Sequence, residues 1–254
     1  MRNIKLTLEY DGTGFEGWQF QPGKHRSVQG EIERAFLKIF TKKVRLIASG
    51  RTDSGVHAYG QVANCKIKSK LPAAEIQKAL NGNLPRDIVV LDVTDAPAAF
   101  HAQYSVRSKI YRYTILNRPT RCARLRQFCL HVPYPLNVPR MKQEARALIG
   151  RKDFRSFMVS DPKKELKPRG TVRTVHGITI KRIEDFITID IEADGFLYKM
   201  VRSIIGTLIE VGHGRLPKGS VKEILKRKDR RCAGYTAKPH GLCLLTVKYK
   251  ATKK

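Results

Sequence analysis

The sequence predicts an α+β protein made of two halves, each with a mostly antiparallel sheet and helices on one face. The first supporting observation is the order of periodic segments before residue 105: strand, helix, strand, strand, helix, strand. That order is typical of a ferredoxin-like, or split βαβ, unit. The second is the order after residue 105: strand, helix, hairpin, helix, helix, strand. The third is the length of 254 residues, which suits one large or two modest domains. We therefore expect two ferredoxin-like (split βαβ) halves, with domains at 1–104 and 105–254.

The first half contains four predicted strands and two predicted helices. Strands are expected where apolar and polar residues alternate, at 4–9, 44–48, 63–67 and 88–93. A helix is expected at 28–40, where an apolar stripe follows Ser27, a good N-cap residue. A second, shorter helix is expected at 72–80.

The second half also contains predicted strands and helices, but they follow one another in a different order. Strands are expected at 109–117, 171–183, 186–193 and 242–249, and helices at 141–149, at 197–212 and after residue 220. Ser220 and Glu223 have the spacing of a capping box. Residues 150–157 are expected to form a turn. The basic segment 160–170 is expected to be a mobile loop, which suits an RNA clamp and a plain solvated loop equally well.

The charge points to a polyanionic partner. Lys and Arg number 50 against 22 Asp and Glu, a formal net charge of +28. Such an excess favours nucleic acid through electrostatic attraction and counterion release. Because the basic residues occur in clusters along the whole chain, they indicate a folded protein with a broad contact surface.

Cysteine and histidine give no sign of a disulfide framework or a metal site. The five cysteines lack C-x-x-C spacing, and the seven histidines include no H-x-x-x-H pair. The first residues lack the apolar core of a signal peptide, and no apolar run reaches eighteen residues. We expect a cytoplasmic, reduced protein with no metal and no membrane contact.

A glycine-rich stretch at 48–63 carries the first candidate catalytic residue. About ten residues separate its flanking strands, more than the two to five of a usual hairpin. It holds Arg51, Asp53 and His57 within seven positions. In a basic protein, a carboxylate fixed in a loop is a candidate nucleophile or base. The competing interpretation, favoured for an arbitrary Asp of this kind, is a turn residue that bonds its own backbone.

Three further features each allow two interpretations. Trp18 and Gln19 end a glycine-rich loop, where an aromatic ring either stacks on a base or pins the loop to the core. Tyr111 lies on one face of a strand with Tyr113, as a base-stacking ring or as part of the core edge. Arg202 interrupts an apolar helix, so it either extends to solvent or pairs with a carboxylate such as Asp53.

Several strings resemble one enzyme family. Gly-Arg-Thr-Asp-Ser-Gly-Val-His-Ala at 50–58 resembles the catalytic loop of the tRNA pseudouridine synthases, especially the bacterial A type, which has Ala at the position of Ser54. Similar family strings are Tyr-Asp-Gly-Thr at 10–13, Phe-His-Ala at 100–102, Lys-Ile-Tyr-Arg-Tyr at 109–113, Gly-Phe-Leu-Tyr-Lys-Met-Val-Arg-Ser-Ile-Ile-Gly at 195–206 and Gly-Leu-x-Leu at 241–244. Two positions depart from the family: Gln103, often Arg there, and 237–239, where the family has Ala-Pro-Ala.

The resemblance implies a role for each candidate. Asp53 would be the catalytic aspartate, Arg202 its partner and Tyr111 the ring that stacks on the target uracil. One of Leu242 and Leu244 would line the uracil pocket. The remaining candidates, which would contact RNA or shape the loop, are Arg51, His57, Trp18 and Gln19.

The same resemblance implies an overall mode of action. It predicts one large sheet joined from the two halves, a basic central cleft and a homodimer that holds the anticodon arm of tRNA. The expected reaction is isomerisation of uridine to pseudouridine at positions 38, 39 and 40, with no cofactor.

Two other classes of function fit the sequence less well. A ribosomal-type RNA-binding protein explains the charge, but it leaves Asp53 with the wrong sign for a phosphate-binding loop. A metal-dependent RNA hydrolase needs a cluster of carboxylate or histidine ligands, and the sequence shows none.

Overall fold

The computed structural model describes residues 1–23, 25–159 and 170–250. Their ten strands are mostly antiparallel and are accompanied by five α-helices, which confirms the α+β class. The chain divides into two compact units, Met1–Arg107 with Cys243–Lys254, and Ser108–Leu242. The division after residue 107 lies close to the expected boundary at 104. The last strand, expected in the second domain, groups with the first unit because it pairs with a strand there.

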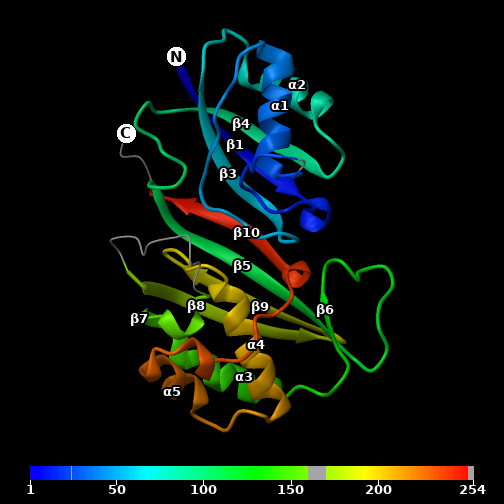
Figure 1. Cartoon of the computed structure of the whole chain (residues 1–254), viewed down its shortest axis with the longest axis vertical. Coiled ribbons are helices and arrows are strands. Elements are labelled where there is room, and N and C mark those ends of the chain that lie inside the picture. The colour runs from blue at the N-terminus through cyan, green and yellow to red at the C-terminus, as the bar shows by residue number, and fades with distance from the viewer. Residues whose placement is uncertain (24, 160–169, 251–254) are drawn as a thin grey trace. The chain divides into compact units, whose positions relative to one another are not determined.

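The first unit has the expected split βαβ order. Its elements are β1 (Arg2–Tyr10), α1 (Val28–Phe40), β2 (Ile47–Ala48), β3 (His57–Ile67), α2 (Ala73–Asn83), β4 (Ile88–Ala96) and β10 (Leu242–Tyr249). The strands follow the order β4-β1-β3-β10, with β2 against β3. Only the pairing of β10 with β3 is parallel among those described in this unit. Figure 1 shows α1 and α2 on the same face of β1, β3 and β4.

The core of the first unit forms between that face and the two helices. Alternate residues of β1 are fully buried, and so are apolar residues of both helices, among them Ile4, Leu6, Leu8, Ile32, Phe36, Ile76 and Leu80. The hydroxyl of Ser27 accepts a hydrogen bond from the Gly30 amide at 3.3 Å, so the predicted N-cap of α1 is confirmed.

The strand after the glycine-rich stretch begins earlier than predicted. β3 starts at His57, not at residue 63, and the loop before it is confined to 49–56. The cause is pairing with two strands from elsewhere in the chain: β1 pairs with β3 from Ala58 onward, and β10 pairs in parallel through Cys243 opposite His57 and Leu244 opposite Ala58. A Cβ on Gly60 would lie 2.5 Å from the Leu245 carbonyl oxygen, so a glycine lets the two strands approach.

The second unit contains the remaining strands and helices. They are β5 (Val106–Asn117), β6 (Leu130–Val132), α3 (Val138–Ala145), β7 (Gly150–Asp153), β8 (Val172–Ile183), β9 (Phe186–Ala193), α4 (Met200–His213) and α5 (Ser220–Arg227). The antiparallel order is β5-β9-β8-β7, with β6 parallel to β5. The predicted hairpin is therefore confirmed as β8–β9. Part of the turn expected at 150–157 is strand β7, and the basic loop expected at 160–170 lies almost wholly outside the described residues.

The predicted capping box at the start of α5 is wrong. Gly219 is the N-cap, with φ of 87°, and the Ser220 hydroxyl donates to the Pro217 carbonyl at 2.6 Å. A carboxylate from α3 takes over the capping: Glu144 accepts from the amide of Gly219 at 2.6 Å and from that of Val221 at 3.1 Å. The start of α5 is therefore capped by a carboxylate from another helix and not by the local Ser220–Glu223 pattern.

None of the helices in the described ranges is long and apolar enough to cross a membrane.

Candidate active site

Asp53 lies in a tight turn of the loop 49–56, between β2 and β3. The Val56 amide donates to the Asp53 carbonyl at 3.2 Å and closes the turn. The Asp53 side chain is partly exposed. Arg51, two residues earlier, is exposed and has no ion pair or side-chain hydrogen bond with another residue of the described chain. The loop therefore presents a carboxylate and a cation toward its accessible side.

A buried glutamine fixes the start of this loop. Gln61 of β3 is fully buried. Its Oε1 accepts from the Ser49 hydroxyl at 2.6 Å and from the Val62 amide at 3.1 Å, and its Nε2 donates to the Gly50 carbonyl at 2.9 Å. Because a buried polar group without a partner is costly, these bonds strongly favour one conformation at the point where the loop begins.

The middle of the loop is attached to the end of β1 and the segment after it. The Thr52 carbonyl accepts from the Trp18 amide at 3.1 Å, and the Thr52 hydroxyl hydrogen-bonds the Tyr10 hydroxyl at 2.8 Å. Burial raises the pKa of Tyr10 well above its ordinary value, so this phenol stays protonated and available to the bond. Trp18 is 2% exposed, and its ring centroid lies 6.2 Å from that of Tyr10. Trp18 thus shapes the loop from the core, whereas Gln19 beside it is partly exposed.

Gly17 allows this close attachment. Its φ is +97°, a conformation that residues with a side chain rarely adopt. A Cβ at this position would lie 2.7 Å from the Thr52 carbonyl oxygen and 3.2 Å from both the carbonyl carbon of Asp53 and the amide nitrogen of Ser54. The backbone that carries Asp53 therefore rests directly on the backbone of Gly17.

The end of the loop is held by the same segment. The Phe15 carbonyl accepts from the Ser54 hydroxyl at 3.2 Å and from the Gly55 amide at 3.3 Å. His57 is 5% exposed, and its Nδ1 accepts from the Gly12 amide at 3.0 Å. These contacts favour the loop-structure interpretation of His57 over direct RNA contact.

The two candidate leucines are both buried in β10. Leu244 is fully buried and lies opposite Ala58, directly after the loop, in the first unit. Leu242 is 5% exposed and is grouped with the second unit. Of the two, Leu244 is therefore the one whose strand register is tied to the Asp53 loop.

The two tyrosines of β5 have different surroundings in the second unit. Tyr113 is fully buried, and its hydroxyl donates to the Lys238 carbonyl at 2.7 Å. Tyr111 is 8% exposed, and its ring meets that of Phe196 edge-on at 5.2 Å between centroids. Tyr113 is thus a core residue, and Tyr111 remains the stacking candidate.

Arg202 lies in the first turn of α4 and is held by a neighbouring segment. Its Nε donates to the Ala237 carbonyl at 2.7 Å, and the Ala237 amide donates to the Arg202 carbonyl at 3.0 Å. The segment packs closely on α4, because a Cβ on Gly206 would overlap the Tyr235 carbonyl. The guanidinium therefore does not extend freely into solvent, as the competing interpretation required. Asp53 and Arg202 belong to different units.

The comparison with known proteins identifies the family. A model of the tRNA pseudouridine synthases matches residues 7–105 and 145–250, which include the Asp53 loop and α4. The chain belongs to the tRNA pseudouridine synthase family.

Relatives in this family match along nearly the whole chain. A protein of Thermoanaerobacter sp. (strain X514) named tRNA pseudouridine synthase A is 47% identical over 249 residues, which are 98% of this chain and 100% of the relative. A Geobacillus sp. (strain WCH70) protein of the same name is 44% identical over 98% of each chain. Among solved structures, a chain from the crystal structure of a Cbf5-Nop10-Gar1 complex aligns with 97% of this chain and 58% of its own length, at 12% identity and a TM-score of 0.39.

Sequence reasoning missed the residues that hold the synthase loop in place. These residues are Tyr10, Gly17, Thr52 and Gln61. They lie within the two glycine-rich stretches described above, which were singled out for Trp18 and Asp53. Their role depends on contacts between residues 11 to 42 positions apart, which periodicity does not reveal. The described residues contain no group of three or more His, Cys, Asp or Glu that could hold a metal ion. The chemistry available on this loop is that of a carboxylate.

Proposed function

We propose that this synthase isomerises uridine to pseudouridine in the anticodon arm of tRNA, at positions 38, 39 and 40, with Asp53 as the catalytic carboxylate. Membership of the tRNA pseudouridine synthase family supports the reaction and its tRNA substrate. The observation that carries the role of Asp53 is the loop itself: buried side chains and backbone contacts hold it at its start, middle and end, yet Asp53 keeps an accessible side.

The proposed reaction needs a positioned carboxylate and no redox step. The N-glycosidic bond breaks, the uracil turns, and a carbon–carbon bond forms to the same ribose. Asp53 either attacks or deprotonates the ribose. A rigid loop favours both routes, because holding a reacting group in place removes much of the entropic cost of the step.

Arg202 and Tyr111 complete the proposed machinery. We propose that Arg202 serves as the partner of Asp53 and that Tyr111 stacks on the target base. The bonds between Arg202 and Ala237 support this role, because they orient the guanidinium before substrate binds. The target nucleotide must leave its stack to reach Asp53, a cost that stacking on an aromatic ring helps to offset.

RNA recognition is proposed to depend mainly on shape and phosphate contacts. The net charge of +28 supports this, and so does the exposure of Arg51, which we propose contacts a phosphate or the extruded nucleotide. We further propose that Leu244 lines the uracil pocket, and that the chain acts as a cytoplasmic homodimer, as the resemblance implies.

The deciding experiment compares Asp53→Asn with a matched control. Unmodified tRNA is incubated with wild type, Asp53→Asn and Asp92→Asn, and pseudouridine is mapped by chemical sequencing. Asp92 is an exposed residue of β4 in the same unit. Wild type and Asp92→Asn should form pseudouridine, and Asp53→Asn should bind tRNA without forming product. Product from Asp53→Asn would overturn the catalytic assignment, whereas binding without product by the wild type would point to a ribosomal-type RNA-binding protein.

The same assay tests whether the modified uridines are those at positions 38, 39 and 40 of the tRNA. In tRNAs with cytidine in place of uridine at 38, 39 and 40, the wild type should form no pseudouridine. Modification that persists elsewhere in such a tRNA would contradict the anticodon-arm assignment while leaving the reaction itself intact.

A further inference from the structure

The second unit has an open pocket outside the residues assigned above. It has a volume of about 380 Å³ and is lined by Ala147, Lys152, Asp153, Lys222, Leu225, Lys226 and Lys228. These residues come from η2 (Arg146–Leu148), β7, α5 and the residue that ends α5. Neither the Asp53 loop nor Arg202, Tyr111 or the candidate leucines contribute to it. A volume of this size falls in the usual range for small-molecule and nucleotide sites.

Its walls carry more positive than negative charge. Four lysines face one carboxylate, that of Asp153. Lys228 forms an ion pair with this carboxylate at 3.7 Å, and Lys226 forms one with Glu223 at 2.9 Å. Lys152 and Lys222 have no ion pair with any residue of the described ranges. Two ammonium charges at the pocket are therefore left uncompensated.

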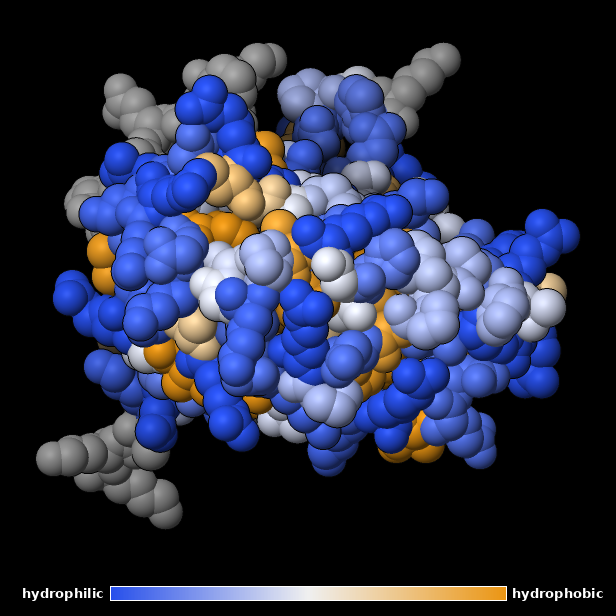
Figure 2. Space-filling view, turned by 90° about the horizontal axis from the view of Figure 1, so that it is seen from below, coloured by the Kyte–Doolittle hydropathy of each residue, from blue (hydrophilic) through white to orange (hydrophobic). Residues whose placement is uncertain are grey.

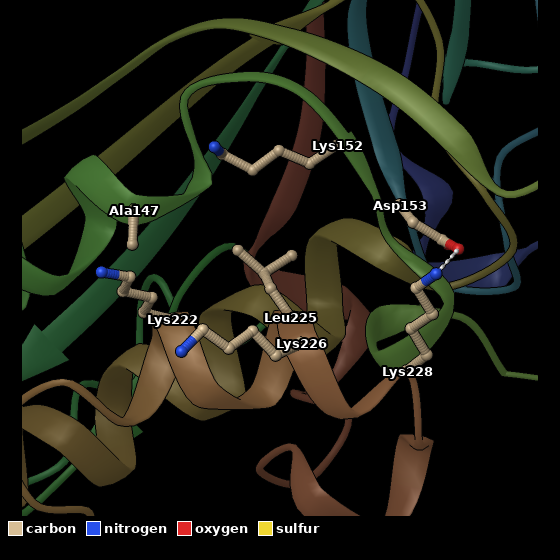
Figure 3. A pocket seen from close by; sticks show the side chains of 7 residues that line it. All are labelled: Ala147, Lys152, Asp153, Lys222, Leu225, Lys226 and Lys228. Atoms are coloured by element: carbon tan, nitrogen blue, oxygen red, sulfur yellow. Dashed lines mark ion pairs between the residues drawn. The ribbon is translucent and has the colours of Figure 1, made fainter.

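The arrangement of these lysines suits an anion. In Figure 3 the ammonium groups of Lys152, Lys222 and Lys226 point to the same side of the pocket, whereas Lys228 turns toward Asp153. Lys222 and Lys226 lie four residues apart on α5, so they share one face of that helix. Like charges on one side of a pocket repel one another, and a bound anion relieves that repulsion.

The floor of the pocket is apolar, which narrows the class of anion. Leu225 and Ala147 lie between the lysine side chains (Figure 3). An apolar floor below a cationic rim suits a nucleotide unit, whose ribose or base covers the floor while its phosphate meets the ammonium groups. Figure 2, which views the molecule from below, shows a mostly hydrophilic face with apolar patches between the charged side chains. Neighbouring exposed cations would attract the same RNA strand, namely Arg146, Arg151 and Arg227.

We propose that this lysine pocket binds a phosphodiester-linked nucleotide of the tRNA, separate from the nucleotide that is isomerised. This proposal rests on the tRNA substrate of the proposed function, but it does not depend on which residues catalyse the reaction. A contact of this kind adds affinity and positions the substrate without touching the reacting atoms. It should therefore affect KM and leave kcat unchanged.

The test removes the two uncompensated charges and measures tRNA binding as a function of salt. Lys152→Gln/Lys222→Gln is compared with the charge-matched control Lys66→Gln/Lys68→Gln, which removes two exposed lysines from the end of β3 in the other unit. If both pocket lysines contact phosphate, the slope of log Kd against log salt should fall by about 1.4 to 1.8. KM should rise in parallel, kcat should stay at the wild-type value, and Lys152→Arg/Lys222→Arg should retain most of the affinity.

A second measurement locates the contact directly. Lysines of the wild type are acetylated in the presence of tRNA, or of inorganic phosphate at the same total phosphate concentration, and are mapped by mass spectrometry. Lys152 and Lys222 should be protected by tRNA and not by free phosphate. Equal slopes for the two double variants, or acetylation of both lysines at unchanged rates in the tRNA complex, would overturn the proposal. Protection by inorganic phosphate alone would instead make the pocket a small-anion site and would also overturn it. Failure of the Asp53→Asn test would leave these binding results unaffected.

Discussion

Gly17 and Thr52 are packed backbone to backbone, with space for a hydrogen and not for a methyl group. A Cβ on Gly17 would lie 2.7 Å from the Thr52 carbonyl oxygen, and that same oxygen accepts the Trp18 amide. Since Thr52 directly precedes Asp53, the conformation of the segment that follows β1 is coupled to the position of the catalytic candidate. Gly17 would thus control the active-site loop through its backbone contact with Thr52.

Gly17→Ala should therefore lower stability and kcat together. The φ of +97° alone costs a residue with a side chain about 1–2 kcal/mol, and the overlap with Thr52 adds to it. Denaturant unfolding and single-turnover kinetics on tRNA give the two quantities. The matched control is Gly82→Ala in α2, where a Cβ meets nothing within 4 Å. That control should keep wild-type kcat, and a Gly17→Ala enzyme with wild-type kcat would show that the loop does not depend on this contact.

Gln61→Leu should reduce kcat more than its loss of stability explains. The change leaves the Ser49 hydroxyl and the Gly50 carbonyl without their buried partner, a cost of about 1–3 kcal/mol for each unsatisfied group. The loop would then adopt several conformations at its start. Gln77→Leu is the control, because Gln77 also donates to two carbonyls in this unit, those of Val90 and Leu91, but does not touch the loop. Equal effects of the two variants on kcat would contradict a positioning role for Gln61.

The fold could be predicted because its elements are locally encoded. Strand alternation, the apolar stripe after Ser27 and the long apolar helix around Arg202 each depend on residues within one element. The candidates from family resemblance, Asp53 above all, also follow from short contiguous strings. The start of β3 at His57 and the cap of α5 could not be predicted in this way. They depend on β10 and on Glu144, which come from distant parts of the chain.

The same limit explains why the sequence left two interpretations open for Trp18 and why Gln61 was missed. Burial of an aromatic ring beside glycines is decided by what packs on it, here the ring of Tyr10. From sequence alone, a glutamine in a strand is expected at the surface. Gln61 is buried because the loop to which it is hydrogen-bonded covers it. Residues that act by holding other segments leave little trace in periodicity.

Cys122 and Cys65 should react with iodoacetamide at very different rates. The Leu125 amide donates to the Cys122 sulfur, and Arg124 and Arg118 lie nearby, so the pKa of the Cys122 thiol falls below its usual value. Burial raises the pKa of Cys65 to about 12. Because the thiolate is the reactive form, Cys122 should be alkylated first at pH 7.5, and its rate should reach a plateau at a lower pH than that of an ordinary thiol.

The Cys65 thiol should stay unlabelled until the chain unfolds, as peptide mapping with and without urea can show. In the unfolded chain the Cys65 pKa returns to about 9, so its contribution to stability is complete below pH 9 and is lost as pH rises through about 12. Labelling of Cys65 in the folded protein at the same rate as Cys122 would contradict the burial of β3.

Glu144→Ala should destabilise the second unit by about 2–3 kcal/mol, because the variant removes two hydrogen bonds from a charged acceptor at the start of α5. Glu144 is 5% exposed, so water replaces these bonds poorly. Thermal unfolding should show the lower Tm, with partial rescue in Glu144→Gln, which keeps one acceptor oxygen. Glu223→Ala on the exposed side of α5 is the control and should change the Tm little, since its ion pair with Lys226 is open to solvent. If Glu144→Ala and Glu223→Ala unfold at the same temperature, α5 does not depend on the carboxylate from α3, and the Gly219 N-cap is sufficient on its own.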